Sequence, residues 1–260
     1  MIHCKSEKEV ELLRQSNLLV SRTLAEMAKI IEPGVTTFHL DAVAEKFILD
    51  NGAVPAFKGY GGFPATLCIS VNDTVVHGFP SAYVLKEGDI VSVDCGCILN
   101  GYVGDSAFTF PVGEISEEAK KLLDYTRASL EEGITMAVTG NRVGDIGYAV
   151  QKKAESGGFS VVREFVGHGL GKKMHESPEV PNYGRRGTGP LMRKGLVICI
   201  EPMINMGTKD VYILDDGWTV KTGDGKYSAH FEKAVAVNNE KADVLTTYDY
   251  IDEVLTEKYN

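Results

Sequence analysis

IVSVDCGCILNGYVGDS, residues 90–106, decides the fold of this chain. Its apolar residues predict two strands, Ile90 to Leu99 and Tyr102 to Val112, on either side of Asn100-Gly101. Asn-Gly between apolar residues is typical of a two-residue hairpin turn. The sequence therefore predicts an antiparallel hairpin at the centre of a sheet.

This hairpin brings two aspartates together. A two-residue turn pairs Leu99 with Tyr102 and Gly96 with Asp105, and Asp94 then lies on the same face as a diagonal neighbour, about 7–8 Å away. Two carboxylates on one sheet face are unfavourable unless a positive charge lies between them. The alternative is a solvated sheet edge, but residues 90–93 are mostly apolar and read as buried. We interpret both aspartates as candidate metal ligands.

Cys95 and Cys97 could form a second metal pair, yet on this strand they face away from Asp94. Successive side chains of a strand point to opposite faces, so an apolar layer is the simpler interpretation for both thiols.

The rest of the chain alternates between helical and strand-like patterns. Asn17 interrupts the apolar stripe of the first helix, and Thr37 is the expected N-cap of the second. Predicted helices cover Glu7 to Ile31, Phe38 to Asp50, Ser116 to Met136 and Asp145 to Ser156. Further predicted strands cover Leu67 to Val71, Val161 to Val166, Leu196 to Ile200 and Ala229 to Val237.

Glycines recur at nearly constant offsets and indicate an internal duplication. Six residues after the last glycine of each series stands an acid, Asp94 in one half and Glu201 in the other. Chance similarity between amphipathic segments is the alternative. A duplication predicts a single α+β domain over residues 1–260, with halves at about 10–112 and 116–240 sharing a sheet. The matching pairs are Gly34 with Gly140, Gly52 with Gly158, and Gly88 with Gly195.

Three more residues complete a candidate ligand set with the two aspartates. His168 stands within GHGLG, residues 167–171, where glycines permit close backbone approach. Glu201 follows an apolar strand directly, and such an acid is costly to bury unpaired. Glu232 lies within residues 229–237, on one face with His230 and Ala234, although an ion pair with a lysine would also explain it.

The remaining histidines carry weaker signals. His175, downstream of the glycine-rich segment, could be a functional or a plain loop residue, and His77 alone decides nothing. We interpret His3, His39 and His230 as structural or surface residues.

Four carboxylates and one imidazole suit two divalent cations, because four negative charges would balance two doubly charged ions. Oxygen-rich ligation with one histidine favours Mn, Fe(II) or Co(II), with Zn also suitable, and calcium fits less well. Two ions about 3.5–4 Å apart can hold a bridging hydroxide for attack on a carbonyl. The sequence predicts a metal-dependent hydrolase.

Composition excludes several other classes. The 260 residues carry a net charge of −9, which argues against nucleic acid as the main ligand. We find neither a signal peptide at the N-terminus nor an apolar run long enough for a membrane span. Five cysteines without a C-x-x-C pair suit reduced thiols in the cytoplasm.

Taken together, these motifs resemble type I methionine aminopeptidases, in their short bacterial form. The resemblance implies the pita-bread fold, in which two pseudo-symmetric halves surround a curved antiparallel sheet with helices on its outer face. The segments that carry it are VNDTVVHGFP (residues 71–80), Asp94, Gly104-Asp105-Ser106, GHGLG (residues 167–171), Ile200-Glu201-Pro202 and Phe231-Glu232.

The resemblance also implies a role for each ligand. Asp94 is similar to the aspartate that chelates one metal, and Asp105 to the aspartate that bridges both. His168 and Glu201 resemble ligands of the other metal, and Glu232 resembles the second bridging carboxylate. Glu201 is also similar to a residue that shuttles a proton to the leaving amine.

Further residues match substrate-binding positions of this family. His77 resembles the histidine that contacts the scissile amide nitrogen, and His175 the one that hydrogen-bonds the substrate carbonyl. Five positions match the lining of a methionine pocket: Tyr60, Phe63, Cys68, Met174 and Trp218. Three positions depart from the family pattern, where an aromatic or a histidine is commoner: Met174, Val103 and Lys233.

The implied activity is that of a methionyl aminopeptidase, which removes the initiator methionine of nascent proteins when the second residue is small. A cytoplasmic monomer acting near the ribosome exit region, without membrane or nucleic-acid binding, would follow. Two alternatives remain: a prolidase or aminopeptidase P relative, and a metal-free binding protein on the same fold. Turnover of X-Pro peptides would favour the first, and absence of bound metal the second.

Overall fold

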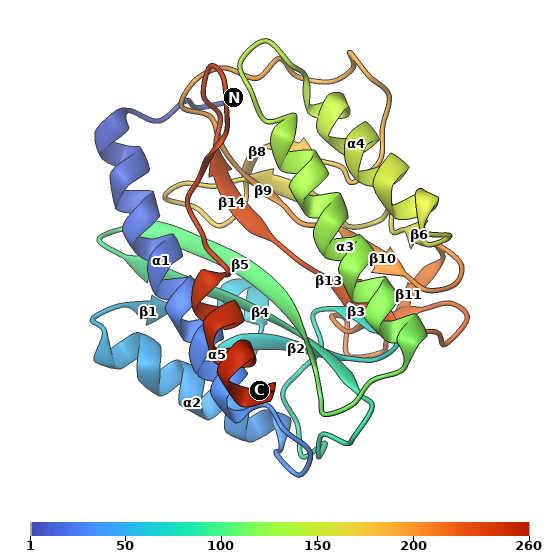
Figure 1. Cartoon of the computed structure of the whole chain (residues 1–260). Helices are drawn as coiled ribbons and strands as arrows, with labels where there is room; N and C mark the ends of the chain where they lie inside the picture. Colours follow the sequence, from blue (N-terminus) through green and yellow to red (C-terminus); the bar gives the residue numbers. More distant parts are fainter. Residues whose placement is uncertain (1, 260) are drawn as a thin grey trace.

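Helices and antiparallel strands alternate along the chain in the computed structural model, which describes residues 2–259 (Figure 1). The helices are α1 (Glu7–Ile30), α2 (Thr37–Asp50), α3 (Glu117–Thr135), α4 (Val143–Ser156) and α5 (Asp249–Tyr259), with a 3-10 turn at Tyr60–Gly62. The strands of the first half are β1 (Val54–Pro55), β2 (Leu67–Val71), β3 (Thr74–Val76), β4 (Ile90–Leu99) and β5 (Tyr102–Pro111). Those of the second half are β6 (Ser160–Val161), β7 (Gly167–Gly169), β8 (Glu176–Val180), β9 (Val197–Ile200), β10 (Met203–Asn205), β11 (Val211–Ile213), β12 (Val220–Thr222), β13 (Ser228–His230), β14 (Lys233–Ala236) and β15 (Asp243–Val244).

The β4–β5 hairpin forms in the predicted register. Leu99 pairs with Tyr102 and Gly96 with Asp105, and both turn residues have positive φ (54° and 77°), as a two-residue hairpin of this type requires. Cys95 and Cys97 are fully buried, which confirms that they face an apolar layer, and all five cysteines are free.

Helix α1 crosses the hairpin at very short range. A Cβ atom on Gly104 would lie 2.5–2.7 Å from backbone atoms of Ser16 and Asn17, so only glycine fits there. The Asn17 side chain is buried, and its Oδ1 accepts the Asp105 backbone N–H at 3.0 Å. Asn17, the polar residue that interrupts the apolar stripe of α1, thus binds the backbone of the strand that carries Asp105.

The helices cover one side of the strands, as Figure 1 shows. α1 packs on β4 and β5, and α5 packs on α1, while α3 and α4 contact strands of the second half. The strands form two larger antiparallel sheets, β1-β4-β2 with β5 added on β4, and β15-β14-β9-β7-β8. β14 lies against β5, so the two halves meet along the middle of the molecule.

The glycines of the proposed repeat have matching backbone conformations. The φ angles are 99° and 95° at Gly34 and Gly140, and 74° and 86° at Gly52 and Gly158. Helices α2 and α4, which these glycines flank, both have 14 residues. The agreement supports duplicated halves within one domain, which stays a prediction.

Several predicted boundaries are wrong. The strand predicted over residues 161–166 is confined to Ser160–Val161, and the exposed, charged Arg163 and Glu164 interrupt the apolar run that predicted it. The N-cap of α2 is Thr36, whose hydroxyl accepts the His39 N–H, and α4 begins two residues earlier than predicted.

The largest correction concerns residues 229–237. This run forms two strands in different sheets, β13 beside β10 and β14 beside β9, with Phe231 and Glu232 between them. Glu232 therefore does not follow a single alternating strand with His230 and Ala234. Within residues 2–259, no helix is long and apolar enough to cross a membrane.

Candidate metal centre

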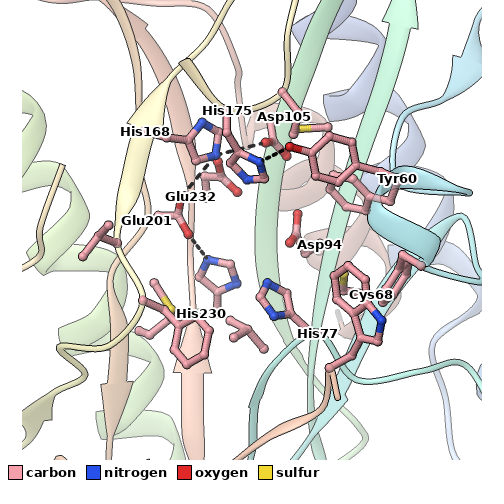
Figure 2. Close-up of a pocket in the computed structure, with 18 residues that line it drawn as sticks. Tyr60, Cys68, His77, Asp94, Asp105, His168, His175, Glu201, His230 and Glu232 are labelled. Carbon is pink, nitrogen blue, oxygen red and sulfur yellow. Dashed lines mark hydrogen bonds and ion pairs between the residues drawn. The ribbon is translucent and has the colours of Figure 1, made fainter. Parts of the chain in front are cut away.

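Five strand regions deliver the five predicted ligands to one cavity of about 190 Å³ (Figure 2). β4 carries Asp94 and β5 carries Asp105, while β7 carries His168. Glu201 directly follows β9, and Glu232 stands between β13 and β14. The cavity lies where the two halves meet, so each half contributes ligands.

Backbone anchors fix the two glutamates where regular strand structure ends. The Asn182 side chain donates from Nδ2 to the Glu201 carbonyl at 2.9 Å. The Ser106 hydroxyl donates to the Glu232 carbonyl at 2.6 Å. These contacts leave both carboxylates free to face the cavity.

The hydrogen bond of His168 determines which of its ring nitrogens is free. Nδ1 lies 3.0 Å from the Gly169 carbonyl oxygen, which can only accept, so Nδ1 carries the proton. Burial lowers the His168 pKa to about 4, so the ring is neutral. Its bare Nε2 lies 3.4 Å from Glu201 Oε1 and 3.6 Å from Asp105 Oδ2.

Three of the carboxylate oxygens also lack a donor. Asp94 Oδ1, Asp105 Oδ1 and Glu232 Oε1 are buried without a hydrogen-bond partner. Desolvation raises the pKa of Asp94 to about 7. Burial, followed by repulsion from neighbouring acids, raises the pKa values of Asp105, Glu201 and Glu232 well above the usual range. Converging lone pairs of this kind fit divalent cations, which would satisfy every one of them.

Cys199 is a close neighbour that the sequence did not reveal. Its sulfur groups with ligand atoms of Asp105, His168 and Glu232, all within 4.8 Å of one another. Burial raises the pKa of the Cys199 thiol well above its usual range, and Cys199 does not line the cavity. We therefore interpret it as a buried thiol behind Glu232. Cys199 stands two residues before Glu201, and residues two apart on a strand point to the same face. This spacing was the signal available in the sequence.

His77 and His175 both line the cavity, at different places (Figure 2). His77 has a positive φ of 59°, an uncommon conformation that is found at functional sites. Burial lowers its pKa to about 4. His175 lies ring to ring with His168, with centroids 4.4 Å apart, and its Nδ1 is 2.7 Å from the Tyr60 hydroxyl.

Of the two interpretations of His230, structural or surface, the surface one is wrong. His230 is 2% exposed and lines the cavity, with Nε2 3.8 Å from Glu201 Oε2 and no hydrogen-bond partner. Burial lowers its pKa to about 3. His3 and His39 are exposed, as expected.

An apolar slot adjoins the carboxylates. Phe63 packs edge-on against Trp218 with centroids 5.2 Å apart, and Cys68 joins the same cluster. Met174 approaches Gly96, where a Cβ would come within 3.1 Å of its methyl group. The predicted pocket residues all line the cavity, together with residues that the sequence did not single out: Phe57, Val76, Phe165, Val166 and Met203.

A cluster of carboxylates with one bare imidazole nitrogen, beside an apolar slot, is typical of a metal-dependent hydrolase. Comparison with known proteins agrees with this class. Residues 11–239 match metallopeptidase family M24. The chain belongs to this family, among its methionine aminopeptidases.

Individual relatives match over nearly their full lengths. The chain is 54% identical over 246 residues to a methionine aminopeptidase of Clostridium perfringens, covering 95% of this chain and 99% of the relative. The crystal structure of methionine aminopeptidase from Rickettsia prowazekii superposes with a TM-score of 0.94 at 39% identity, covering 95% of this chain and all of that one. These neighbours confirm the pita-bread fold.

An X-Pro aminopeptidase from Thermotoga maritima shares the fold at 22% identity, with a TM-score of 0.75. It covers 94% of this chain, but this chain spans only 62% of that protein. The likeness concerns the fold alone and does not favour the prolidase alternative.

Proposed function

We propose that this protein is a methionyl aminopeptidase that hydrolyses the bond after an N-terminal methionine. One observation carries the proposal: an apolar slot opens onto a cluster of unpartnered carboxylates, in a chain 54% identical to a protein named methionine aminopeptidase. A thioether side chain is apolar, flexible and polarizable, and it packs well against aromatic rings.

The cofactors of this proposal are two divalent ions, with Co, Mn, Fe(II) or Zn as candidates. Asp94 would hold one ion, His168 and Glu201 the other, and Asp105 and Glu232 both. Such ions activate water at neutral pH and polarise a carbonyl group. The lack of a protein donor to one buried oxygen each of Asp94, Asp105 and Glu232 supports this assignment.

Glu201 is the proposed proton carrier. Its two oxygens face His168 and His230, and its raised pKa favours uptake of a proton during the reaction. A carboxylate with a raised pKa holds a proton more readily and can later release it to the leaving amine.

The methionine side chain is proposed to enter the slot lined by Tyr60, Phe63, Cys68, Met174 and Trp218. His77 and His175 would then contact the peptide group. Burial keeps both rings neutral, so each can offer one N–H and one bare nitrogen. A large second side chain would have to fit beside the metal ligands, so small second residues are expected.

The direct test is release of methionine from Met-Ala-Ser and Met-Leu-Ser with added Mn²⁺, Fe²⁺ or Co²⁺. We expect turnover of the first peptide, much slower turnover of the second, and loss of activity in Asp105→Asn. Asp210→Asn, at an exposed aspartate, is the matched control. No methionine release with any of these metals would contradict the proposal, and cleavage of X-Pro peptides alone would favour the prolidase alternative.

We further propose that the protein acts as a monomer in the cytoplasm, on nascent chains near the ribosome exit region. This setting follows from the proposed substrate, because initiator methionine becomes accessible where nascent chains emerge. Co-sedimentation with translating ribosomes would test it.

A further inference from the structure

Tyr248 is a fully enclosed tyrosine just before helix α5, outside the stretch matched by the family. Its ring packs edge-on against Phe108, with centroids 5.0 Å apart. Lys233 Nζ lies 4.4 Å from the ring centroid, and the Arg127 guanidinium carbon lies 5.4 Å from it. Two cations over one aromatic ring hold that ring firmly in place.

The hydroxyl of Tyr248 contacts the backbone of Glu232. It lies 2.8 Å from the carbonyl oxygens of Ala107 and Glu232, and it accepts the Glu232 N–H at 2.9 Å. Ser106 donates to the same Glu232 carbonyl. The one hydroxyl proton is shared between the two carbonyls, and the phenol oxygen contacts both the N–H and the carbonyl of Glu232.

Backbone pairing supplies only part of this support, through the Glu232 N–H, which also lies 2.9 Å from the Ala107 carbonyl oxygen of β5. The last pair of β13 is His230 with Met203, and the first pair of β14 is Lys233 with Ile200. Glu232 lies between these two ladders, where the chain passes from one sheet to the other. The Glu232 carbonyl at this crossing is contacted by two side-chain hydroxyls, those of Ser106 and Tyr248.

Lys233, the residue after Glu232, does not orient Glu232. Its ammonium group pairs with Glu131 at 2.7 Å and lies over the Tyr248 ring. It therefore points away from the cavity, whose lining does not include it. The charge at this position supports the tyrosine rather than contacting a ligand.

We propose that Tyr248 is a positioning residue of the metal centre, which holds Glu232 in its ligating orientation from the C-terminal segment. The inference rests on the proposed function, in which Glu232 is a metal ligand. Residues that orient metal ligands commonly change metal affinity by about 10–100-fold when they are replaced. The structure thereby gives the C-terminal segment a role in metal binding.

The test is calorimetric titration of metal-free Tyr248→Phe with Mn²⁺, beside the wild type and Tyr83→Phe. The control removes a tyrosine hydroxyl that donates to Asp89, which does not line the cavity. We expect the Kd for Mn²⁺ to rise about tenfold or more in Tyr248→Phe and to change less than about twofold in Tyr83→Phe. The visible absorption spectrum of bound Co²⁺ should also change only in Tyr248→Phe, because it reports ligand geometry.

The outcomes distinguish failure of the proposed function from failure of the positioning role of Tyr248. Failure of the wild type to bind Mn²⁺ or Co²⁺ would contradict the proposed function itself. Wild-type binding with an unchanged Kd and Co²⁺ spectrum in Tyr248→Phe would overturn the positioning role. If Tyr248→Phe does not fold, Lys233→Met removes a cation that lies over the Tyr248 ring, and an unchanged Mn²⁺ Kd and Co²⁺ spectrum in that variant would overturn the inference.

Discussion

At the residue scale, His168 and His175 lie ring to ring but present different nitrogens. His168 donates from Nδ1 to the Gly169 carbonyl, which leaves its Nε2 bare. At His175, Nδ1 is the atom that meets the Tyr60 hydroxyl. A phenol is the better donor and an imidazole nitrogen the better acceptor, so Tyr60 donates and the His175 proton resides on Nε2. One histidine is thereby suited to bind a cation and the other to donate to a carbonyl.

Tyr60→Phe tests this arrangement because it removes only the hydroxyl. We expect kcat on Met-Ala-Ser to fall about tenfold with little change in KM, since a misoriented donor stabilises developing charge less well. Nitrogen-15 NMR of histidine-labelled protein should show the His175 tautomer becoming mixed. Tyr212→Phe, at an exposed tyrosine, is the control. An unchanged tautomer together with unchanged kcat would contradict the assignment.

The sequence predicted most of the cavity at this scale because the acids stand beside apolar runs or glycines, where a charge is conspicuous. The sequence did not identify His230 as a cavity residue. Its position depends on which strands lie next to one another, and the pattern of a single strand does not show this. Asn17 looked like a flaw in an amphipathic helix, although its partner is the Asp105 backbone on a distant strand. Contacts between distant segments are absent from local periodicity.

At the element scale, the position of the β4–β5 hairpin depends on its contact with α1. The hairpin carries both aspartates, and α1 covers it where Gly104 meets the backbone of Ser16 and Asn17. Backbone atoms cannot rotate away as a side chain can. The spacing between α1 and β5 is therefore fixed by the absence of a Cβ atom.

Gly104→Ala is expected to destabilise the protein by about 2 kcal/mol or more, because overpacking forces backbone shifts. Chemical denaturation of the metal-free protein measures the change. Gly52→Ala is the comparison, since its Cβ would meet no neighbour and only its positive φ of 74° adds strain, about 1–2 kcal/mol. A smaller loss at Gly104 than at Gly52 would show that α1 can shift without cost.

Sequence patterns placed the four long helices to within two residues at each end, because each has an apolar face and clear end signals. The short strands were harder. Val162, Phe165 and Val166 are apolar but lie outside any strand, and residues 229–237 change sheets partway along a strand-like run. Apolar character reports burial and does not report the identity of the pairing partner.

At the scale of the whole molecule, the two halves meet at a cavity that holds four acids and the rings of four histidines. The acids have raised pKa values in the folded chain, so without cations they must take up protons or repel one another. The stability of the fold and occupancy of the site are therefore linked through protons.

The direction in which the stability of the fold changes with pH can be predicted. An acid whose pKa is raised on folding contributes stability at low pH that is lost as the pH rises through its folded value, about 7 for Asp94. The lowered histidine pKa values act in the opposite direction, but only below about pH 6.5, where an unfolded histidine becomes charged. Just above that pH, below the range in which unfolded cysteines ionise, the acids set the slope.

Metal-free protein should therefore lose stability as the pH rises from about 6.5 through the folded pKa of about 7 at Asp94, by up to about 1.4 kcal/mol per pH unit for each acid that is protonated only in the folded chain. Thermal melts across this range, with and without Mn²⁺, provide the measurement. Added metal should raise Tm most at high pH, because it binds the deprotonated acids. Asp94→Asn, which removes one titrating group, should show a shallower slope in its metal-free form. A metal-free Tm that is flat or rises with pH would mean that the four acids are not held in the protonated cluster that the cavity geometry implies.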